Sequence, residues 1–108
     1  MKKANVVQSL GALAHPIRLD VYRALVVAGP EGLTPGALID KLDVPSAKLS
    51  FHLKELSIAG LVTQERSSRN VIYRAAYDQM HGVVSYLTDN CCNGFVMAAR
   101  QADPACAC

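Results

Sequence analysis

Apolar side chains recur every three to four residues along most of this chain, which predicts a mainly helical domain. Two breaks divide its first part. One is His15-Pro16, because proline disfavours the helical conformation in the residue before it, and the other is the Gly-Pro-Glu-Gly sequence at 29–32. They delimit two expected helices, over residues 3–14 and 16–28. A third helix begins at Thr34-Pro35, since threonine is a good helix cap and proline fits the first helical position.

A tight turn at Val44-Pro45-Ser46 leads to a fourth helix, which runs to Ala59 and ends at Gly60. β-type residues then flank a polar centre at 66–70, which predicts a hairpin with a basic tip. The last helix starts near Tyr77 and carries an apolar stripe that Cys91 continues. The expected fold class is therefore mainly α with a β-hairpin wing, which is a winged helix-turn-helix.

Composition agrees with one small domain whose core is aliphatic. The chain has 108 residues, 51% of them hydrophobic, and contains no tryptophan. It has no apolar run long enough to span a bilayer, so we expect no membrane partner. The N-terminus faintly resembles a signal peptide, but Asn5, Gln8 and Ser9 interrupt its apolar part, and we expect a cytoplasmic protein.

The formal net charge of +2 is distributed unevenly along the chain. Residues 44–76 contain five basic and two acidic side chains, whereas residues 77–108 contain one basic and three acidic ones. The middle of the chain is therefore expected to attract a polyanion and the C-terminal third is not.

The fourth helix has two different faces when its residues are placed at about 100° per residue. Leu49, Leu53 and Leu56 share the face expected to be buried, and small, hydroxylated and basic residues lie elsewhere. Such a helix fits a DNA major groove, where hydroxyls and small apolar groups meet base edges. The candidate DNA-binding residues are Ser46, Ala47, Ser50 and Phe51 for bases, Lys48 and Lys54 for phosphates, and Arg66, Arg69 and Asn70 on the hairpin. His52 is expected to have a packing or hydrogen-bonding role, and His15 a structural role at the junction before Pro16.

Three motifs of this chain resemble the ArsR/SmtB family of winged helix-turn-helix repressors: LGALAHPIRLDVYRAL, VPSAKLSFHLKELSIAGLV and ERSSRNVIYR. The resemblance covers about residues 6–90. It implies a homodimer built from the helices over 3–14 and 77–91, which binds a near-palindromic operator and is released by metal. The family's base-reading positions fall on the four residues proposed above. Phe51 departs from the family, in which a polar residue is more usual, so the operator sequence stays open.

All four cysteines lie after residue 90, at Cys91, Cys92, Cys106 and Cys108. Thiolates favour soft or thiophilic ions. A vicinal pair with a third thiol suits trivalent arsenic, As(III), or antimony, Sb(III), whereas four thiols suit tetrahedral zinc, although adjacent cysteines are awkward ligands for one zinc ion. We therefore expect residues 1–90 to form the DNA-binding and dimerisation domain and 91–108 to be a cysteine-bearing segment.

The family resemblance favours arsenic among these ions. Some arsenic-responsive members carry cysteines in the first helix of the helix-turn-helix, where this chain has none, and the zinc ligands of other members are incomplete here. The remaining type binds arsenic at the end of the last helix and in the tail, which implies Cys91, Cys92 and either Cys106 or Cys108 as ligands. The hypothesis is a homodimeric operator-binding repressor that arsenite releases.

Three alternatives stay open at this point. The same repressor can respond to an organic trivalent arsenical, to another soft metal or to thiol oxidation. An enzyme with a reactive cysteine, such as an arsenate reductase, is disfavoured because the sequence contains no phosphate-cradling loop, and we expect the chain not to be an enzyme. The third alternative is a protein-interaction module that has lost DNA binding.

Overall fold

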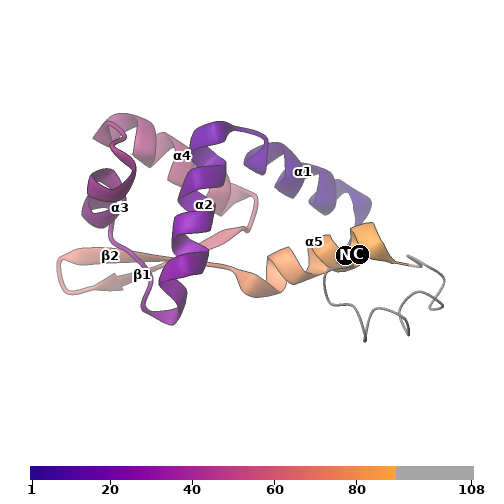
Figure 1. Cartoon of the computed structure of the whole chain (residues 1–108). Helices are drawn as coiled ribbons and strands as arrows, with labels where there is room; N and C mark the ends of the chain where they lie inside the picture. The colour runs from indigo at the N-terminus through magenta and orange to yellow at the C-terminus, as the bar shows by residue number, and fades with distance from the viewer. Residues whose placement is uncertain (90–108) are drawn as a thin grey trace, which may run out of the picture.

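The computed structural model describes residues 1–89, which form five α-helices, one 3₁₀ turn and a two-stranded antiparallel sheet (Figure 1). The elements in chain order are α1 (Lys3–Leu13), α2 (Pro16–Ala28), the 3₁₀ turn η1 (Gly29–Glu31), α3 (Pro35–Leu42), α4 (Ser46–Ile58), β1 (Val62–Ser67), β2 (Asn70–Ala75) and α5 (Tyr77–Thr88). Figure 1 shows α2 in the middle, with α3, α4 and the hairpin on one side and α1 and α5 on the other. The predicted fold class, mainly α with a β-hairpin wing, is confirmed.

Local chemistry sets the helix boundaries where the sequence predicted them. The Thr34 hydroxyl accepts a hydrogen bond from the backbone N–H of Ala37 at 3.2 Å and caps α3. His15 caps α2 in the same way, because its Nδ1 atom accepts from the N–H of Ile17 at 3.1 Å. Gly60, which follows the end of α4, has a φ of 79°, in the left-handed region that favours glycine.

The core is built mainly from leucine side chains of the central helices. Leu25 of α2, Leu38 of α3, and Leu49, Leu53 and Leu56 of α4 are all essentially fully buried. Burying one such side chain contributes about 1.5–3 kcal/mol. These contacts fix α4 against α2 and α3 through the leucine face that the sequence predicted to be buried.

The hairpin is longer than the sequence indicated. β1 pairs with β2 from Val62↔Ala75 to Ser67↔Asn70, which leaves Ser68 and Arg69 as a two-residue turn. Ser68 takes a φ of 56°, as the first position of a tight hairpin turn requires. The sequence predicted a polar tip over residues 66–70, but the turn contains only Ser68 and Arg69. Pairing between the strands continues up to that turn, so Arg66 lies in β1.

The terminal helices show details that the sequence pattern did not predict. In α1 the buried residues are Val6, Ser9 and Ala12, whereas the large apolar residue Leu10 is exposed. The helix packs on α2, α4 and α5 by the face that carries its small residues, which permit close approach. In α5 the helix ends at Thr88, since Asp89 leaves the helical conformation with a ψ of 130°, and residues 90 and 91 of the predicted 77–91 helix lie outside the described residues.

Apolar side chains remain exposed along both terminal helices. They are Met1 before α1, Val7 and Leu10 of α1, and Tyr77, Val84, Tyr86 and Leu87 of α5. Apolar surface of this extent at the end of a small domain is typical of a protein–protein contact. Within the part of the chain that the structure describes, no helix has the length and apolar character needed to span a membrane.

Candidate nucleic-acid interface

The outer face of α4 carries every residue that was predicted to contact bases. Ser46, Ala47, Ser50 and Phe51 are exposed, while the leucines of the opposite face are buried. Phe51 retains 53% of its accessible surface, although it is a large apolar residue. Lys48 and Lys54 are exposed on the same helix and extend its positive charge. The helix thus presents hydroxyls, a small apolar group and an aromatic ring to a partner, with cations beside them.

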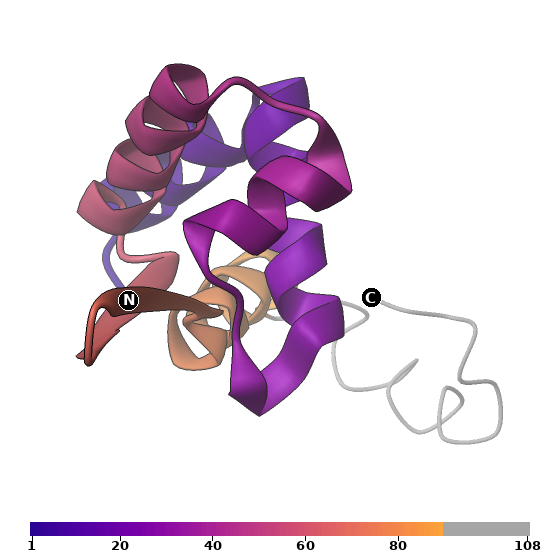
Figure 2. The same cartoon turned by 90° about the vertical axis from the view of Figure 1, so that its left-hand side faces the viewer.

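The hairpin adds a second basic element next to this helix. Figure 2 shows α4 and the hairpin along the same edge of the molecule. Arg66, Arg69 and Asn70 are exposed there, although Arg66 lies in β1 and not in the turn. A helix flanked by a hairpin with exposed guanidinium groups is suited to follow a DNA groove and its phosphates together.

Arg74 belongs to the fold and not to this basic surface. Its Nη1 atom lies 2.8 Å from Glu65 Oε1 in an ion pair across the hairpin. Its Nε atom donates a hydrogen bond to the backbone oxygen of Pro30 at 2.7 Å. Arg74 therefore links the hairpin to η1. One of the five basic side chains counted over residues 44–76 is thus engaged in contacts within the domain.

A cluster of side chains from α2 and α4 supports the recognition face. The Arg18 Nε atom donates a hydrogen bond to His52 Nδ1 at 3.1 Å, and the Arg18 guanidinium lies 5.5 Å from the centre of the Phe51 ring. His15 packs on His52 with 4.5 Å between ring centres. Phe51 is thereby held by an edge contact with His52 and by a cation over its ring.

Arg18 was absent from the predicted site, because no local pattern links it to a helix that begins 28 positions later in the chain. The sequence places it only on a polar side of α2. In the fold its Nε atom is engaged by His52, which fixes the guanidinium plane beside the exposed Phe51. The recognition surface thus gains a positioned cation that can donate hydrogen bonds to phosphate.

His52 is buried, with 6% of its surface exposed, and must be neutral for Nδ1 to accept the hydrogen bond from Arg18. Burial lowers the pKa of His52 below 6.5, and the nearby His15, Arg18 and Lys48 lower it further. The predicted packing and hydrogen-bonding role of His52 is confirmed by these contacts. His15 likewise has the structural role expected at the α1–α2 junction.

Acid is expected to destabilise the domain through His52. The unfolded chain takes up a proton at this histidine near pH 6.5, whereas the folded chain does so only at lower pH. The stabilising contribution is therefore complete above pH 6.5 and is lost as the pH falls below that value. Urea unfolding at pH 7.5 and 5.0 measures the loss. His52→Asn keeps an acceptor near the position of Nδ1 and should lose less stability between the two pH values, whereas the exposed-site control His81→Asn should behave like the parent.

A hydrogen-bonded network joins the terminal helices to the C-terminal end of the recognition helix. The Gln79 Nε2 atom of α5 donates to Ser9 Oγ of α1 at 3.0 Å and to the backbone oxygen of Ala59 at 3.3 Å. Ser9 is fully buried and its hydroxyl donates to the same Ala59 oxygen at 3.5 Å. Ala59 follows the last residue of α4. A movement of α5 relative to α1 would consequently reach α4 through this contact.

The predicted metal ligands Cys91, Cys92, Cys106 and Cys108 lie outside the described residues. Within residues 1–89 no three His, Cys, Asp or Glu side chains are grouped so as to hold a metal ion. Within those residues the exposed surface of α4 and the hairpin accordingly contains no such cluster.

Together these features define a winged helix-turn-helix domain with an exposed recognition helix. Residues 13–65 match the family model of a helix-turn-helix domain. Over 75 residues the chain is 42% identical to the HTH-type transcriptional repressor SmtB of Mycobacterium tuberculosis, which covers 69% of this chain and 53% of that protein. It is 31% identical over 80 residues to the nodulation protein NolR of Rhizobium meliloti, covering 74% of this chain and 63% of that one. The chain thus spans between half and two thirds of the length of these relatives.

Solved structures share the same architecture. An ArsR-like transcriptional regulator from Rhodococcus sp. RHA1 superposes with a TM-score of 0.73 over 93% of both chains, at 22% identity, which speaks for the fold alone. The homodimeric winged helix-turn-helix domain Mb0332 of Mycobacterium bovis, a possible ArsR-family regulator, has a TM-score of 0.63 at 26% identity over 81% of both chains. A possible transcriptional regulator for arsenical resistance has a TM-score of 0.65 at 25% identity, covering 74% of this chain and 80% of that one.

These matches show what the domain is similar to. The winged helix-turn-helix of this chain resembles transcriptional regulators of the ArsR/SmtB family. SmtB is described as a transcriptional repressor and Mb0332 as a DNA-binding domain, in agreement with the expectation that this chain is not an enzyme.

Proposed function

We propose that the chain is a transcriptional repressor that binds operator DNA as a homodimer and releases it when trivalent arsenic or antimony binds its C-terminal cysteines. The observation that carries the DNA-binding part is the exposed outer face of α4 beside a basic hairpin. Ser46, Ala47, Ser50 and Phe51 contact base edges, and Lys48, Lys54, Arg66, Arg69 and Asn70 contact the backbone or the minor groove. Arg18 joins them as a further cation at the edge of this surface.

The exposed apolar residues of α1 and α5 support the homodimer. In Figure 1 the helices α1 and α5 lie on the side of α2 opposite to α3 and the hairpin, and the similar domain from Mycobacterium bovis is homodimeric. A two-fold dimer sets its two recognition helices about 34–36 Å apart, which is one turn of DNA. Packing of α1 and α5 against a second copy therefore determines whether both helices enter successive major grooves.

Support for arsenic as the signal comes from thiol chemistry and from one relative. A vicinal cysteine pair with a third thiolate offers three soft ligands, which suits a thiophilic trivalent ion. One structural neighbour, described as a possible regulator of arsenical resistance, has the same fold. The alternatives within this function are an organic trivalent arsenical, which two thiols suffice to bind, another soft metal, and thiol oxidation.

Release of DNA would proceed through α5 and the Gln79 network. Cys91 and Cys92 follow the end of α5 in the chain, so ligand binding there acts on the helix that contacts Ser9 and Ala59. A shift of α5 would disturb the hydrogen bonds at the C-terminal end of α4 and the spacing of the two recognition helices. Allosteric couplings of about 1–3 kcal/mol correspond to losses of roughly 5- to 150-fold in DNA affinity.

Arsenite titration tests this assignment. An operator is first selected from random duplexes with the parent protein, and DNA affinity is then measured by fluorescence anisotropy with and without arsenite. The parent should lose roughly 5- to 150-fold in affinity, and Cys91→Ser/Cys92→Ser should bind DNA normally but no longer respond. A double variant that still releases DNA like the parent contradicts the assignment.

Variants of the tail distinguish the alternative signals. If three thiolates hold the ion, Cys106→Ser or Cys108→Ser should blunt the response to arsenite and leave the response to phenylarsine oxide, which needs two thiols, intact. Hydrogen peroxide in place of arsenite tests thiol oxidation. If neither tail variant changes the arsenite response, the third thiol is not needed. An arsenical that binds to two protein thiols then becomes the favoured signal in place of inorganic arsenic.

A further inference from the structure

Phe51 combines exposure with a fixed orientation. Its side chain retains 53% of its accessible surface, and single exposed apolar residues are common on protein surfaces. Phe51 differs from them because its ring is held. The Arg18 guanidinium lies 5.5 Å from the ring centre, and the His52 ring makes an edge contact with 5.4 Å between ring centres. Little ordering is therefore needed when the exposed part of the ring meets a partner.

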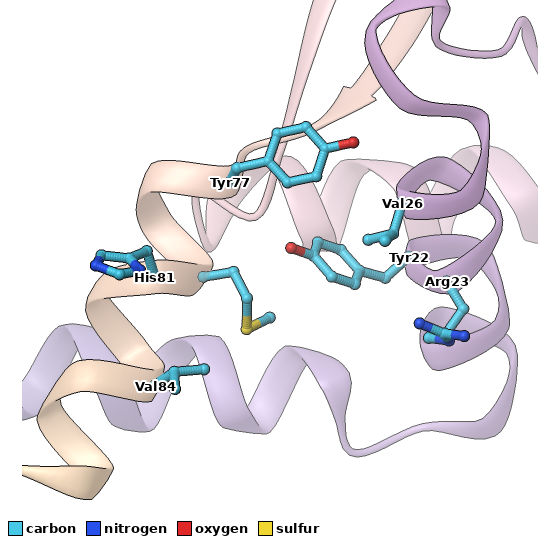
Figure 3. Close-up of a pocket in the computed structure, with 7 residues that line it drawn as sticks. Tyr22, Arg23, Val26, Tyr77, His81 and Val84 are labelled. Carbon is cyan, nitrogen blue, oxygen red and sulfur yellow. The ribbon is translucent and has the colours of Figure 1, made fainter. Parts of the chain in front are cut away.

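The homodimer contact does not account for this exposure. The apolar residues assigned to that contact belong to α1 and α5 or precede α1. Figure 3 shows two of them, Tyr77 and Val84, beside the depression that α5 forms with α2. Phe51 lies instead on the outer face of α4, among the residues proposed to bind DNA. Its ring is therefore available to the DNA.

The neighbours of Phe51 fit a nucleic acid better than another protein. Lys48 and Lys54, three residues before and after it, are exposed, and Arg18 adds a third cation. The core of a protein–protein contact is depleted in charged residues, lysine among them, whereas cations beside a reading residue attract phosphates. Ala47, one helical turn before Phe51, is exposed as well. The outer face thus presents a small apolar surface with positive charge around it.

The base edges of the major groove offer one partner for such a surface. Thymine carries a methyl group there, whereas the other groups on the edges are mainly hydrogen-bond donors and acceptors. A phenyl ring cannot pair with a donor or an acceptor, and covering one without a partner is costly. A phenylalanine in the groove therefore favours thymine over the other bases.

We propose that Phe51 selects a thymine in each half-site of the operator by packing its ring against the methyl group. The inference rests on the proposed operator binding and names the base that one residue of that site recognises. A two-fold dimer binds two half-sites, so the contact occurs twice in each complex.

Operators in which uracil replaces single thymines test this inference, because uracil lacks the methyl group and keeps every hydrogen-bonding atom of thymine. The operator is selected with the parent protein, and affinity is measured by fluorescence anisotropy. One thymine in each half-site should show a loss of about 4-fold on replacement, and of about 15-fold when both half-sites are changed, the effect of one methyl-sized group per contact. Phe51→Ala should lose nothing further from uracil at these positions. Bromouracil, whose bromine takes the place of the methyl group, should restore the affinity of the parent.

Ile58→Ala is the matched control. Ile58 is also an exposed apolar residue, two turns after Phe51 on the same face, but it is the last residue of α4. Since the N-terminal part of a recognition helix contacts the bases, this variant should show the same uracil losses as the parent. Circular dichroism verifies that both variants fold.

Two results overturn the inference and leave operator binding in place. One is equal uracil losses in the parent and in Phe51→Ala, and the other is a selected operator in which no thymine can be replaced with a loss of affinity. If the parent selects no operator from the random duplexes, the proposed function itself fails, and the inference fails with it.

Discussion

Replacement of Ser50 by glutamate should lower the affinity for the selected operator by more than about 100-fold, because like charges brought together at an interface cost several kcal/mol. Ser50 is exposed on the outer face of α4, between the base-contacting candidates Ala47 and Phe51. A carboxylate at this position would enter a groove lined by phosphates. Since the side chain makes no contact with the core, the fold and the dimer should be unaffected. Anisotropy titration measures the affinity, and circular dichroism verifies the fold.

Val27→Glu is the matched control for this substitution. It makes the same change in side-chain charge at an exposed position near the end of α2, remote from α4. Its DNA affinity should stay within a few-fold of that of the parent. An equal loss in both variants would mean that net charge and not the outer face of α4 controls binding. Unchanged affinity of Ser50→Glu would remove α4 as the recognition helix.

Replacement of Gly32 by alanine should destabilise the domain by about 2–5 kcal/mol, the sum of a backbone penalty and a steric one. Gly32 has a φ of 68° and a ψ of −172°, a combination that is essentially restricted to glycine. A Cβ atom there would lie 2.5 Å from the backbone oxygen of Tyr73. The same oxygen accepts the hydrogen bond from Leu33 that joins this segment to β2. Urea unfolding followed by circular dichroism measures the loss.

Gly36→Ala is the control in the same region. Gly36 lies in the first turn of α3, where a Cβ atom would meet only the Thr34 hydroxyl at 4.0 Å. Alanine should stabilise the helix by about 0.4–1 kcal/mol through the lower entropy of the unfolded chain. If both alanine variants gave the same stability, close packing of Gly32 against β2 would not be the reason for its conformation.

The features that the sequence predicted well depend on neighbouring residues. Proline at the start of α2 and the Thr34 cap fix helix starts whatever the rest of the chain does. The spacing of the leucines in α4 predicted which face is buried. The residues on the opposite side were therefore predicted to form the outer face. The hairpin was found from its β-type residues, but its length was not, because a strand ends where pairing ends and not where polarity changes.

The sequence by itself determined a winged helix-turn-helix and a recognition face, because capping, proline position and helical periodicity act over a few residues. The tertiary structure alone decided the contacts that support that face. Arg18 meets His52 across 34 positions, Ser9 reaches Ala59 across 50, and Gln79 reaches Ser9 across 70. It also decided that α1 buries its small residues and leaves Leu10 exposed. Such pairings depend on how whole helices pack against one another, and no local pattern records them.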